Sequence, residues 1–413
     1  MADATLLIVG STAFTSWGRD QIRRLSGQAR RRGVALVGAD TPSNLRVATA
    51  DELSCVDEVV PLDVHDADAC RAWAATRSGI DGVLTIRELA VFPTAVIAEE
   101  LGLPGNDPDA VIRIRNKDLC RDRLREVGFP QPMTAVCDNA DDAKRFMAQT
   151  GPGPWIVKPR DGMASIGVSL IEQPDDLAAA LQKFGSPPPA MGPLPVSQSF
   201  LVETFVSGEE FSAEGVLAGG VPQVLALTRK TIAEGFVETR QRVPAGLNEA
   251  TARAASDAVA QALTAVGITR GIFHVEFWVT ESGIVLGELH DRPGGDFISA
   301  LVEYTLPGLE LYGALIDDLL GLTPAPLPDP TGAASAEFLL APPGRLRAVH
   351  GWEQLTRHPA VLTAHLQVTP GEVIGPAADS YTRSGVFVVG TDTPANLDEL
   401  VAALKSTVVF DVD

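Results

Sequence analysis

The 413-residue sequence lacks several features that would assign it to a class at once. No stretch of about 18 apolar residues runs without a charge, so we expect no membrane-spanning helix. The amino terminus, MADATLLIVG, has no basic segment before its apolar run and does not resemble a secretory signal. We find no internal repeat at a fixed period and no low-complexity segment. The ordinary hydrophobic content of 45% then favours a globular protein with large cores.

Cysteine and positive charge are also scarce. The four cysteines, Cys55, Cys70, Cys120 and Cys137, lack metal-ligand spacing, so we expect reduced, partly buried thiols in a cytoplasmic protein. The formal net charge of -20 argues against nucleic acid or an anionic membrane as a partner, because both require a basic surface. A polyanion would have to bind in a local basic pocket.

The first hundred residues predict an α/β domain without the common dinucleotide motif. The first hundred residues alternate strand and helix patterns, which predicts parallel strands with crossover helices in an open α/β domain. The turn at residues 10–15 lacks GxGxxG, so the dinucleotide fingerprint is absent. Glu88 follows the strand at residues 83–86, where such sheets present functional side chains. An exposed glutamate at a helix start would occupy the same position for its dipole interaction alone.

One lysine stands in an unusual setting. Lys158 lies within the apolar strand pattern WIVKP, where a buried ammonium is unfavourable unless it meets an anion. A small-residue loop follows at residues 162–167 and leads into another strand. Its glycines would let backbone N–H groups approach a phosphate, although no GKT or GKS follows as in a P-loop. A plain hairpin is the alternative interpretation.

The rest of the chain divides at helices and proline-rich segments. We predict single helices over residues 113–127, which include Lys117, and over residues 301–320. Residues 185–197 contain five prolines and read as a linker. A second proline-rich segment at residues 323–332 marks a boundary before a small α+β region.

A predicted hairpin at residues 271–290 carries two carboxylates on one face. Alternating apolar residues place Glu276 on the face opposite Phe277, and a three-residue loop, residues 281–283, would set it directly across from Glu288. Opposed carboxylates repel, so a cation between them is expected. His290 lies on the same face as Glu288, and Arg292 follows two residues later. Salt bridging on a solvated face remains the alternative.

Three segments carry a resemblance to a known family. ELHDRPGGD, at residues 288–296, is similar to the E-x-N-x-R-P-x-G-G motif of the ATP-grasp superfamily and its L-amino-acid ligases. VETFVSGEEFSAE, at residues 202–214, resembles the adenine hinge of that family, and residues 101–124 resemble its lead-in to the first nucleotide lysine. The resemblance implies an α/β pre-grasp domain at 1–112 and an ATP-grasp domain at 113–330. A mobile lid would span about 133–203, and a small α+β carboxyl-terminal domain would span 331–413.

The resemblance also implies the roles of individual residues. Arg292 and Lys158 would be catalytic, with Arg292 stabilising charge that develops on the reacting groups. The expected metal ligands are Glu276, Glu288 and His290, and the expected substrate contacts are Glu88, Glu238, Arg292, Gly295 and Asp296. The ATP contacts would be Lys117, Lys158, Gly162, Ser165, Ile166, Gly167, Glu203, Phe205, Val206 and Glu210.

The implied reaction is ATP-dependent joining of two amino acids through an acyl phosphate, with release of ADP and phosphate. Mg²⁺ is the expected metal. His290 stands where the family motif has asparagine and, since imidazole suits softer metals, makes Mn²⁺ an alternative, with Asp291 as a substitute ligand. Asp296 suggests a polar or cationic acceptor. A homodimer is one assembly the family allows. Alternatives are a ligase acting on bicarbonate or on a non-amino-acid carboxylate, and an ATP-binding module with weakened catalysis.

Overall fold

The structure, a computed structural model, describes residues 4–182, 184 and 199–413. The predicted linker at residues 185–197 lies outside the described residues. In the described part of the chain, no helix combines the length and apolarity needed to cross a bilayer.

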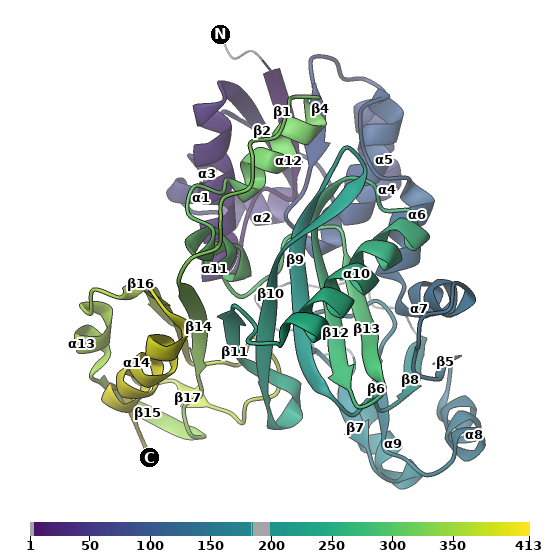
Figure 1. Cartoon of the computed structure of the whole chain (residues 1–413), viewed down its shortest axis with the longest axis vertical. Helices are drawn as coiled ribbons and strands as arrows, with labels where there is room; N and C mark the ends of the chain where they lie inside the picture. The colour runs from purple at the N-terminus through teal and green to yellow at the C-terminus, as the bar shows by residue number, and fades with distance from the viewer. Residues whose placement is uncertain (1–3, 183, 185–198) are drawn as a thin grey trace.

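The N-terminal sheet is parallel, as the sequence predicts, with the strand order β3-β2-β1-β4. Residues of β1 alternate between two cores because successive side chains of a strand face opposite sides. Leu6 and Ile8 pack with α1 and α12, whereas Leu7 and Val9 pack with α4 and α5 (Figure 1). The elements of this region are β1 (Ala4–Val9), α1 (Ser16–Arg31), β2 (Val34–Asp40), α2 (Pro42–Val47), α3 (Ala50–Leu53), β3 (Glu58–Pro61), α4 (Ala67–Ala74), β4 (Gly82–Leu84), η1 (Glu88–Ala90) and α5 (Val91–Leu101).

The predicted helix over residues 113–127 is in fact two helices, α6 (Pro108–Arg115) and α7 (Lys117–Glu126). Asn116 separates them in an extended conformation, with φ of -90° and ψ of 106°. Lys117 therefore begins a helix instead of lying within one. This break turns its side chain toward the interior, where only 8% of the residue is exposed.

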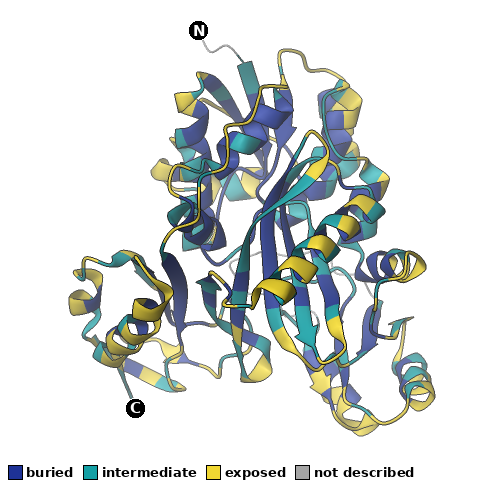
Figure 2. Ribbon diagram, in the orientation of Figure 1, coloured by how far each residue is buried: buried dark blue, intermediate teal, exposed yellow. Residues whose placement is uncertain are grey.

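An eight-stranded sheet forms the centre of the molecule, in the order β13-β12-β9-β10-β11-β14-β18-β16. Helix α10 lies across it, with buried residues toward the strands and exposed residues outward (Figure 2). Asn248 caps this helix by accepting a hydrogen bond from Thr251 N–H at 2.9 Å. The strands and helix are β9 (Glu209–Ala218), β10 (Val221–Ala233), η4 (Glu234–Phe236), β11 (Val237–Val243), α10 (Glu249–Val266), β12 (Gly271–Thr280), β13 (Gly283–His290), β14 (Ala333–Leu339), β16 (Val361–Leu366) and β18 (Gly385–Thr391).

The predicted helix over residues 301–320 is also two helices, α11 (Ile298–Thr305) and α12 (Leu311–Leu319). Pro307 cannot donate a backbone hydrogen bond, and Gly308 adopts φ of 94°, which breaks the helix between them. The break lets α12 pack against α1 of the N-terminal region, while α11 packs near β14.

A separate antiparallel sheet, which we call the distal sheet, has the order β5-β8-β6-β7 and lies at the lower right of Figure 1. Its elements are β5 (Thr134–Cys137), α8 (Ala140–Thr150), β6 (Trp155–Pro159), β7 (Ser169–Ile171), η2 (Pro174–Asp176), α9 (Leu177–Leu181) and β8 (Phe200–Thr204). The carboxyl-terminal region adds β15 (Gly344–His350), α13 (Trp352–Thr356), β17 (Val373–Ile374), α14 (Pro394–Thr407) and β19 (Val409–Val412). Strands β14, β18 and β16 of that region continue the central sheet, so backbone hydrogen bonds join it directly to β11.

Candidate active site

A cavity of about 960 Å³ is bounded by residues of the N-terminal, central and distal sheets. Every residue that the sequence analysis assigned to ATP, metal or substrate lines it, apart from Gly167 and the substitute metal ligand Asp291. The cavity therefore brings together side chains that lie as far apart in the sequence as Glu88 and Asp296.

Two buried lysines meet one carboxylate on the cavity wall. Lys117 Nζ donates to the carbonyl oxygen of Gly162 at 2.7 Å and lies 3.3 Å from Glu288 Oε2. Lys158, on β6, lies 3.8 Å from Glu288 Oε1 and 2.8 Å from Glu203 Oε2. Both ammonium groups and the small-residue loop that follows Lys158 thus face one region. This is the local basic pocket that an acidic protein needs to hold a polyanion.

Glu203 has a different setting from the expected one. Its backbone pairs within the distal sheet, opposite Thr134 on one side and Ile156 on the other, so the side chain is what faces the interior. The carboxylate pairs with Lys158 and with Arg121, whose Nη2 lies 3.2 Å from Oε2. Burial alone would raise the pKa of Glu203, but these two cations outweigh it and lower the pKa to about 2. The sequence analysis did not single out Arg121.

The residues just beyond β8 offer a flat apolar surface. Phe205 and Val206 line the cavity, and Phe205 is 41% exposed. The N–H of Phe205 donates to the carbonyl oxygen of Pro154 at 3.1 Å and is therefore occupied. An aromatic face of this kind can stack against a planar ring.

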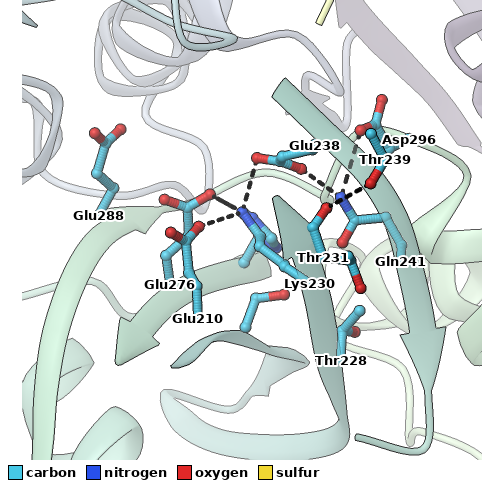
Figure 3. Close-up of polar contacts among 12 residues, drawn as sticks. Glu210, Thr228, Lys230, Thr231, Glu238, Thr239, Gln241, Glu276, Glu288 and Asp296 are labelled. Carbon is cyan, nitrogen blue, oxygen red and sulfur yellow. Dashed lines mark hydrogen bonds and ion pairs between the residues drawn. The ribbon is translucent and has the colours of Figure 1, made fainter. Parts of the chain in front are cut away.

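Lys230 on β10 lies at the centre of a cluster of three glutamates. The sequence analysis named the glutamates but missed Lys230. Its ammonium contacts Glu276 and lies 3.1 Å from Glu238 and 3.3 Å from Glu210 (Figure 3). Burial raises the pKa of Glu210 to about 7, and the negative charges of its neighbours add to this effect. The sequence holds little signal for Lys230, because it stands between Arg229 and Thr231, whereas Lys158 stands in an apolar run.

The same three glutamates, Glu210, Glu238 and Glu276, offer oxygen atoms within 4.8 Å of one another. Such a group suits a hard cation, but the ammonium of Lys230 already lies among them. The residues expected to bind metal, Glu276, Glu288 and His290, do not form an equally close group in the described part of the chain. Figure 3 shows Glu288 apart from the cluster around Lys230.

The hairpin that carries these carboxylates has a shorter loop than predicted. Thr280 pairs with Gly283, which leaves a two-residue loop, and the predicted three-residue loop is therefore wrong. The register shifts between Val275 and Phe277, so that Val275 pairs with Leu289. Beyond the shift the strands return to the register that the longer loop would have produced, and Glu276 and Glu288 both lie in the shifted stretch, between the pairs Val275–Leu289 and Phe277–Leu286.

His290 occupies a position from which it could bind a metal. Its Nδ1 lies 3.1 Å from Glu88 and its Nε2 lies 3.7 Å from Glu288. Burial lowers the pKa of His290, which favours the neutral ring. A neutral ring that donates from Nδ1 to Glu88 keeps a lone pair on Nε2, and metal-binding histidines are commonly oriented in this way.

Glu88 is buried, so the interpretation as an exposed helix-start residue is wrong. Its carboxylate lies 2.6 Å from Arg292 Nε and 3.4 Å from Arg115 Nη1. Burial would raise the pKa of Glu88, but the hydrogen bond from His290 and the charge of Arg292 lower it well below its usual range. Arg292 thus enters the cavity already paired with a residue from the N-terminal region.

Asp291 and Asp296 differ from their expected settings. Asp291 accepts a hydrogen bond from Asn106 Nδ2 at 3.2 Å and does not line the cavity, so it is not a substitute metal ligand there. Asp296 lines the cavity next to Gly295, but Arg383 binds both of its oxygens, at 2.6 and 2.7 Å. The hypothesis of a cationic acceptor therefore loses the free negative charge on which it depended.

Family models match three consecutive segments of the chain. Residues 27–105 match an ATP-grasp N-terminal domain, residues 152–300 an ATP-grasp domain, and residues 337–413 the L-amino acid ligase C-terminal domain 2.

The chain is also similar to individual proteins that are named as ligases. Dapdiamide A synthase of Enterobacter agglomerans is 25% identical over 313 residues, which cover 70% of each chain. Carnosine synthase 1 of Mus musculus is 28% identical over 260 residues, which cover 59% of this chain but only 30% of the mouse protein. The crystal structure of L-amino acid ligase from Bacillus licheniformis superimposes with a TM-score of 0.79 at 20% identity, over the whole of both chains.

Proposed function

Because the chain belongs to the ATP-grasp superfamily and carries an L-amino acid ligase C-terminal domain, we propose that it joins two amino acids by an amide bond through an acyl phosphate. ATP would supply the phosphoryl group, and ADP and phosphate would be released. The enzyme class itself, a carbon–nitrogen ligase of the ATP-grasp type, agrees with the names of its relatives.

The observation that carries the proposal is the meeting of Lys117 and Lys158 at Glu288, beside the loop after β6. Two ammonium groups around one carboxylate form a preformed site for phosphate oxygens and a divalent cation together. The exposed ring of Phe205 lies on the same cavity and would support the adenine.

A magnesium ion would suit the donor atoms of Glu276 and Glu288, but Glu276 contacts Lys230 in this structure and would have to turn from it toward Glu288 to share the ion. Glu276 and Glu288 offer hard oxygen ligands, and His290 has a lone pair facing Glu288. A bound ion would neutralise negative charge on the phosphates. Lys230 would remain the counter-ion of Glu210 and Glu238, which keeps those carboxylates from competing for the metal.

The chemistry needs little covalent participation from the protein. A carboxylate is a poor acyl donor, whereas the acyl phosphate made from it has a phosphate that leaves readily. The amine of the second amino acid attacks the acyl carbon, the bond between that carbon and the phosphate oxygen breaks, and the amine proton passes to solvent. Positioning of the substrates, charge neutralisation and exclusion of water would supply the catalysis.

Arg292 would stabilise the charge that develops on the acyl group, since its guanidinium is held by Glu88 at the cavity wall. By its resemblance to the family, Glu238 would lie near the α-ammonium group of an amino acid, and in this structure Lys230 and Gln241 hold its two oxygens at the cavity wall. Glu88 would orient Arg292 and so contact substrate less directly than the sequence suggested.

The test is analysis of the nucleotide products by mass spectrometry, with ATP, Mg²⁺ or Mn²⁺, and pools of amino acids. We expect ADP together with a new amide mass, whose size identifies the two substrates. AMP would contradict the acyl-phosphate route. No turnover with either metal would favour an ATP-binding module, and turnover that requires bicarbonate or a non-amino-acid carboxylate would favour another ATP-grasp ligase.

A further inference from the structure

The cavity extends beyond the lysines and carboxylates into a lobe built by the N-terminal sheet. The lobe is lined by Thr12 in the segment after β1, by Asp40 at the carboxyl end of β2 and by Arg87 after β4. Strand β1 lies between β2 and β4 in the sheet. The lobe therefore lies outside the carboxyl ends of parallel strands at the point where the strand order reverses, which is where open α/β sheets bind ligands.

Arg87 differs from the other cations of this cavity. Lys117, Lys158, Arg121, Lys230 and Arg292 each form an ion pair with a glutamate. No carboxylate lies within 4.0 Å of the Arg87 guanidinium among residues 4–182, 184 and 199–413. Its partners are uncharged oxygen atoms, on Thr12 at 2.9 Å, Gly18 at 3.2 Å and Gln21 at 3.4 Å.

Two glycines, Gly10 and Gly18, leave the space that the Arg87 side chain occupies. A Cβ atom at Gly18 would lie 2.7 Å from Arg87 Nη1, and one at Gly10 would lie 3.1 Å from Arg87 Cγ. A guanidinium has five N–H groups, so the three hydrogen bonds leave donors unused. Burial lowers the pKa of Arg87 to about 10, as expected for a cation without a paired anion.

The negative charge of Asp40 does not fill this role. Asp40 lies on the same lobe, but Thr12 donates to it from both N–H and hydroxyl, at 2.8 and 2.7 Å. Its other oxygen accepts from Thr41 N–H and from Asn44 Nδ2, both at 2.8 Å. Asp40 therefore holds the walls of the lobe together and leaves Arg87 with unsatisfied positive charge.

We propose that this lobe is a subsite for an oxyanion carried by the side chain of one of the two substrates, a carboxylate or a phosphate, and that Arg87 receives it. The inference deepens the proposed function and rests on it for the identification of the ligand as an amino acid. Arg87 immediately precedes Glu88, whose carboxylate holds Arg292. An amino acid bound near Arg292 would thus extend its side chain toward the adjacent lobe.

The test is isothermal titration calorimetry on the whole protein, with Mg²⁺ and a non-hydrolysable ATP analogue present. Ligands are used in pairs that differ in the anion: L-glutamate with L-glutamine, L-aspartate with L-asparagine, and O-phospho-L-serine with L-serine. We expect one acidic member to bind about tenfold to a hundredfold more tightly than its neutral partner, the range for a hydrogen-bonded charge. The pair that shows the preference distinguishes carboxylate from phosphate.

Variants separate recognition from a structural role. Arg87→Met should abolish the preference for the acidic member, and Arg87→Lys should keep part of it, whereas a merely structural arginine would weaken both members of a pair equally. Arg113→Met is the matched control, because Arg113 also donates to a backbone carbonyl, that of Val266, but does not line the cavity. It should keep the full preference.

Two outcomes would overturn the subsite. The first is equal affinity for the two members of every pair, or no binding of any acidic member. The second is an unchanged preference for the acidic member in Arg87→Met. The result is independent of turnover. ADP release with neutral amino acids alone would preserve the ligase and refute the subsite, whereas tight binding of an acidic member without any ADP release would preserve the subsite and refute the ligase.

Discussion

At the scale of single residues, the buried charges of the cavity are held in ion pairs, and Glu203 is the most constrained of them. Its side chain is 5% exposed and compensates both Lys158 and Arg121. Glu203→Gln would remove the negative charge that Lys158 and Arg121 share. We therefore expect the free energy of unfolding to fall by about 3–5 kcal/mol. Chemical denaturation measures it. Glu126→Gln, which breaks a surface pair with Arg123, is the control and should change stability by less than about 0.5 kcal/mol.

The same glutamate predicts how stability changes with acid. Its pKa falls from an ordinary value of 4.5 to about 2 in the folded protein, so the folded state holds the carboxylate in its charged form. The stabilisation is fully present above the ordinary pKa and is lost as the pH falls toward the folded pKa. The difference in stability between the natural protein and Glu203→Gln should therefore shrink between pH 4.5 and 2. A constant difference across that range would contradict the ion-pair explanation.

Glu288 provides the sharpest test of the metal proposal. Glu288→Gln keeps the shape of the side chain but removes the charge that faces Lys117, Lys158 and His290. We expect kcat for ADP release to fall about a hundredfold or more while the melting temperature stays within a few degrees. Glu281→Gln, in the exposed loop of the same hairpin, should keep full activity. Unchanged turnover in the Glu288 variant would remove this residue from the metal site.

At the scale of elements, the register shift in the β12–β13 hairpin decides where the two carboxylates lie. Gly287 lies beside this shift, and a Cβ atom there would be 3.0 Å from the carbonyl oxygen of Glu276. Gly287→Ala should therefore displace Glu276 and lower kcat/KM about tenfold or more, since small misplacements of catalytic groups have large effects. Gly27→Ala, in the interior of α1 where space is open, should leave activity unchanged and raise stability slightly. Equal activity of both variants would show that the shift tolerates a side chain.

At the scale of the whole molecule, three regions meet at Arg383. Its guanidinium lies 3.5 Å from the ring centre of Phe338 and 5.3 Å from that of Trp17, and it binds both oxygens of Asp296. Trp17 comes from the N-terminal region, Asp296 from the segment after the central hairpin, and Phe338 and Arg383 from the carboxyl-terminal region. The arginine thus fixes the carboxyl-terminal region against the cavity wall.

This junction predicts strong coupling between distant residues. Arg383→Met and Asp296→Asn should each lower the free energy of unfolding by about 3–5 kcal/mol, because each leaves a buried charge without its partner. The double variant should lose less than the sum of the two, by more than about 1 kcal/mol in a double-mutant cycle. Additive losses would show that the pair does not join the regions.

Much of this organisation could be predicted from the sequence, because it depends on local patterns. Alternation of strands and helices predicted the parallel N-terminal sheet, and Lys158 was recognised because an ammonium within an apolar strand is unfavourable without an anion. The carboxylate hairpin was recognised by its alternating pattern, whereas the ATP-grasp and amino-acid ligase regions were recognised by resemblance to the family, which the family models confirm.

The tertiary structure alone decided which charges meet. Lys230 pairs with Glu276, 46 residues away in the sequence. Arg121 pairs with Glu203, 82 residues away, and Arg383 pairs with Asp296, 87 residues away. The break at Asn116 and the register shift in the hairpin also depend on how the elements pack against one another. A local pattern determines which face of a strand or helix is apolar, whereas the partner of a buried charge depends on which elements meet, and only the folded chain determines that.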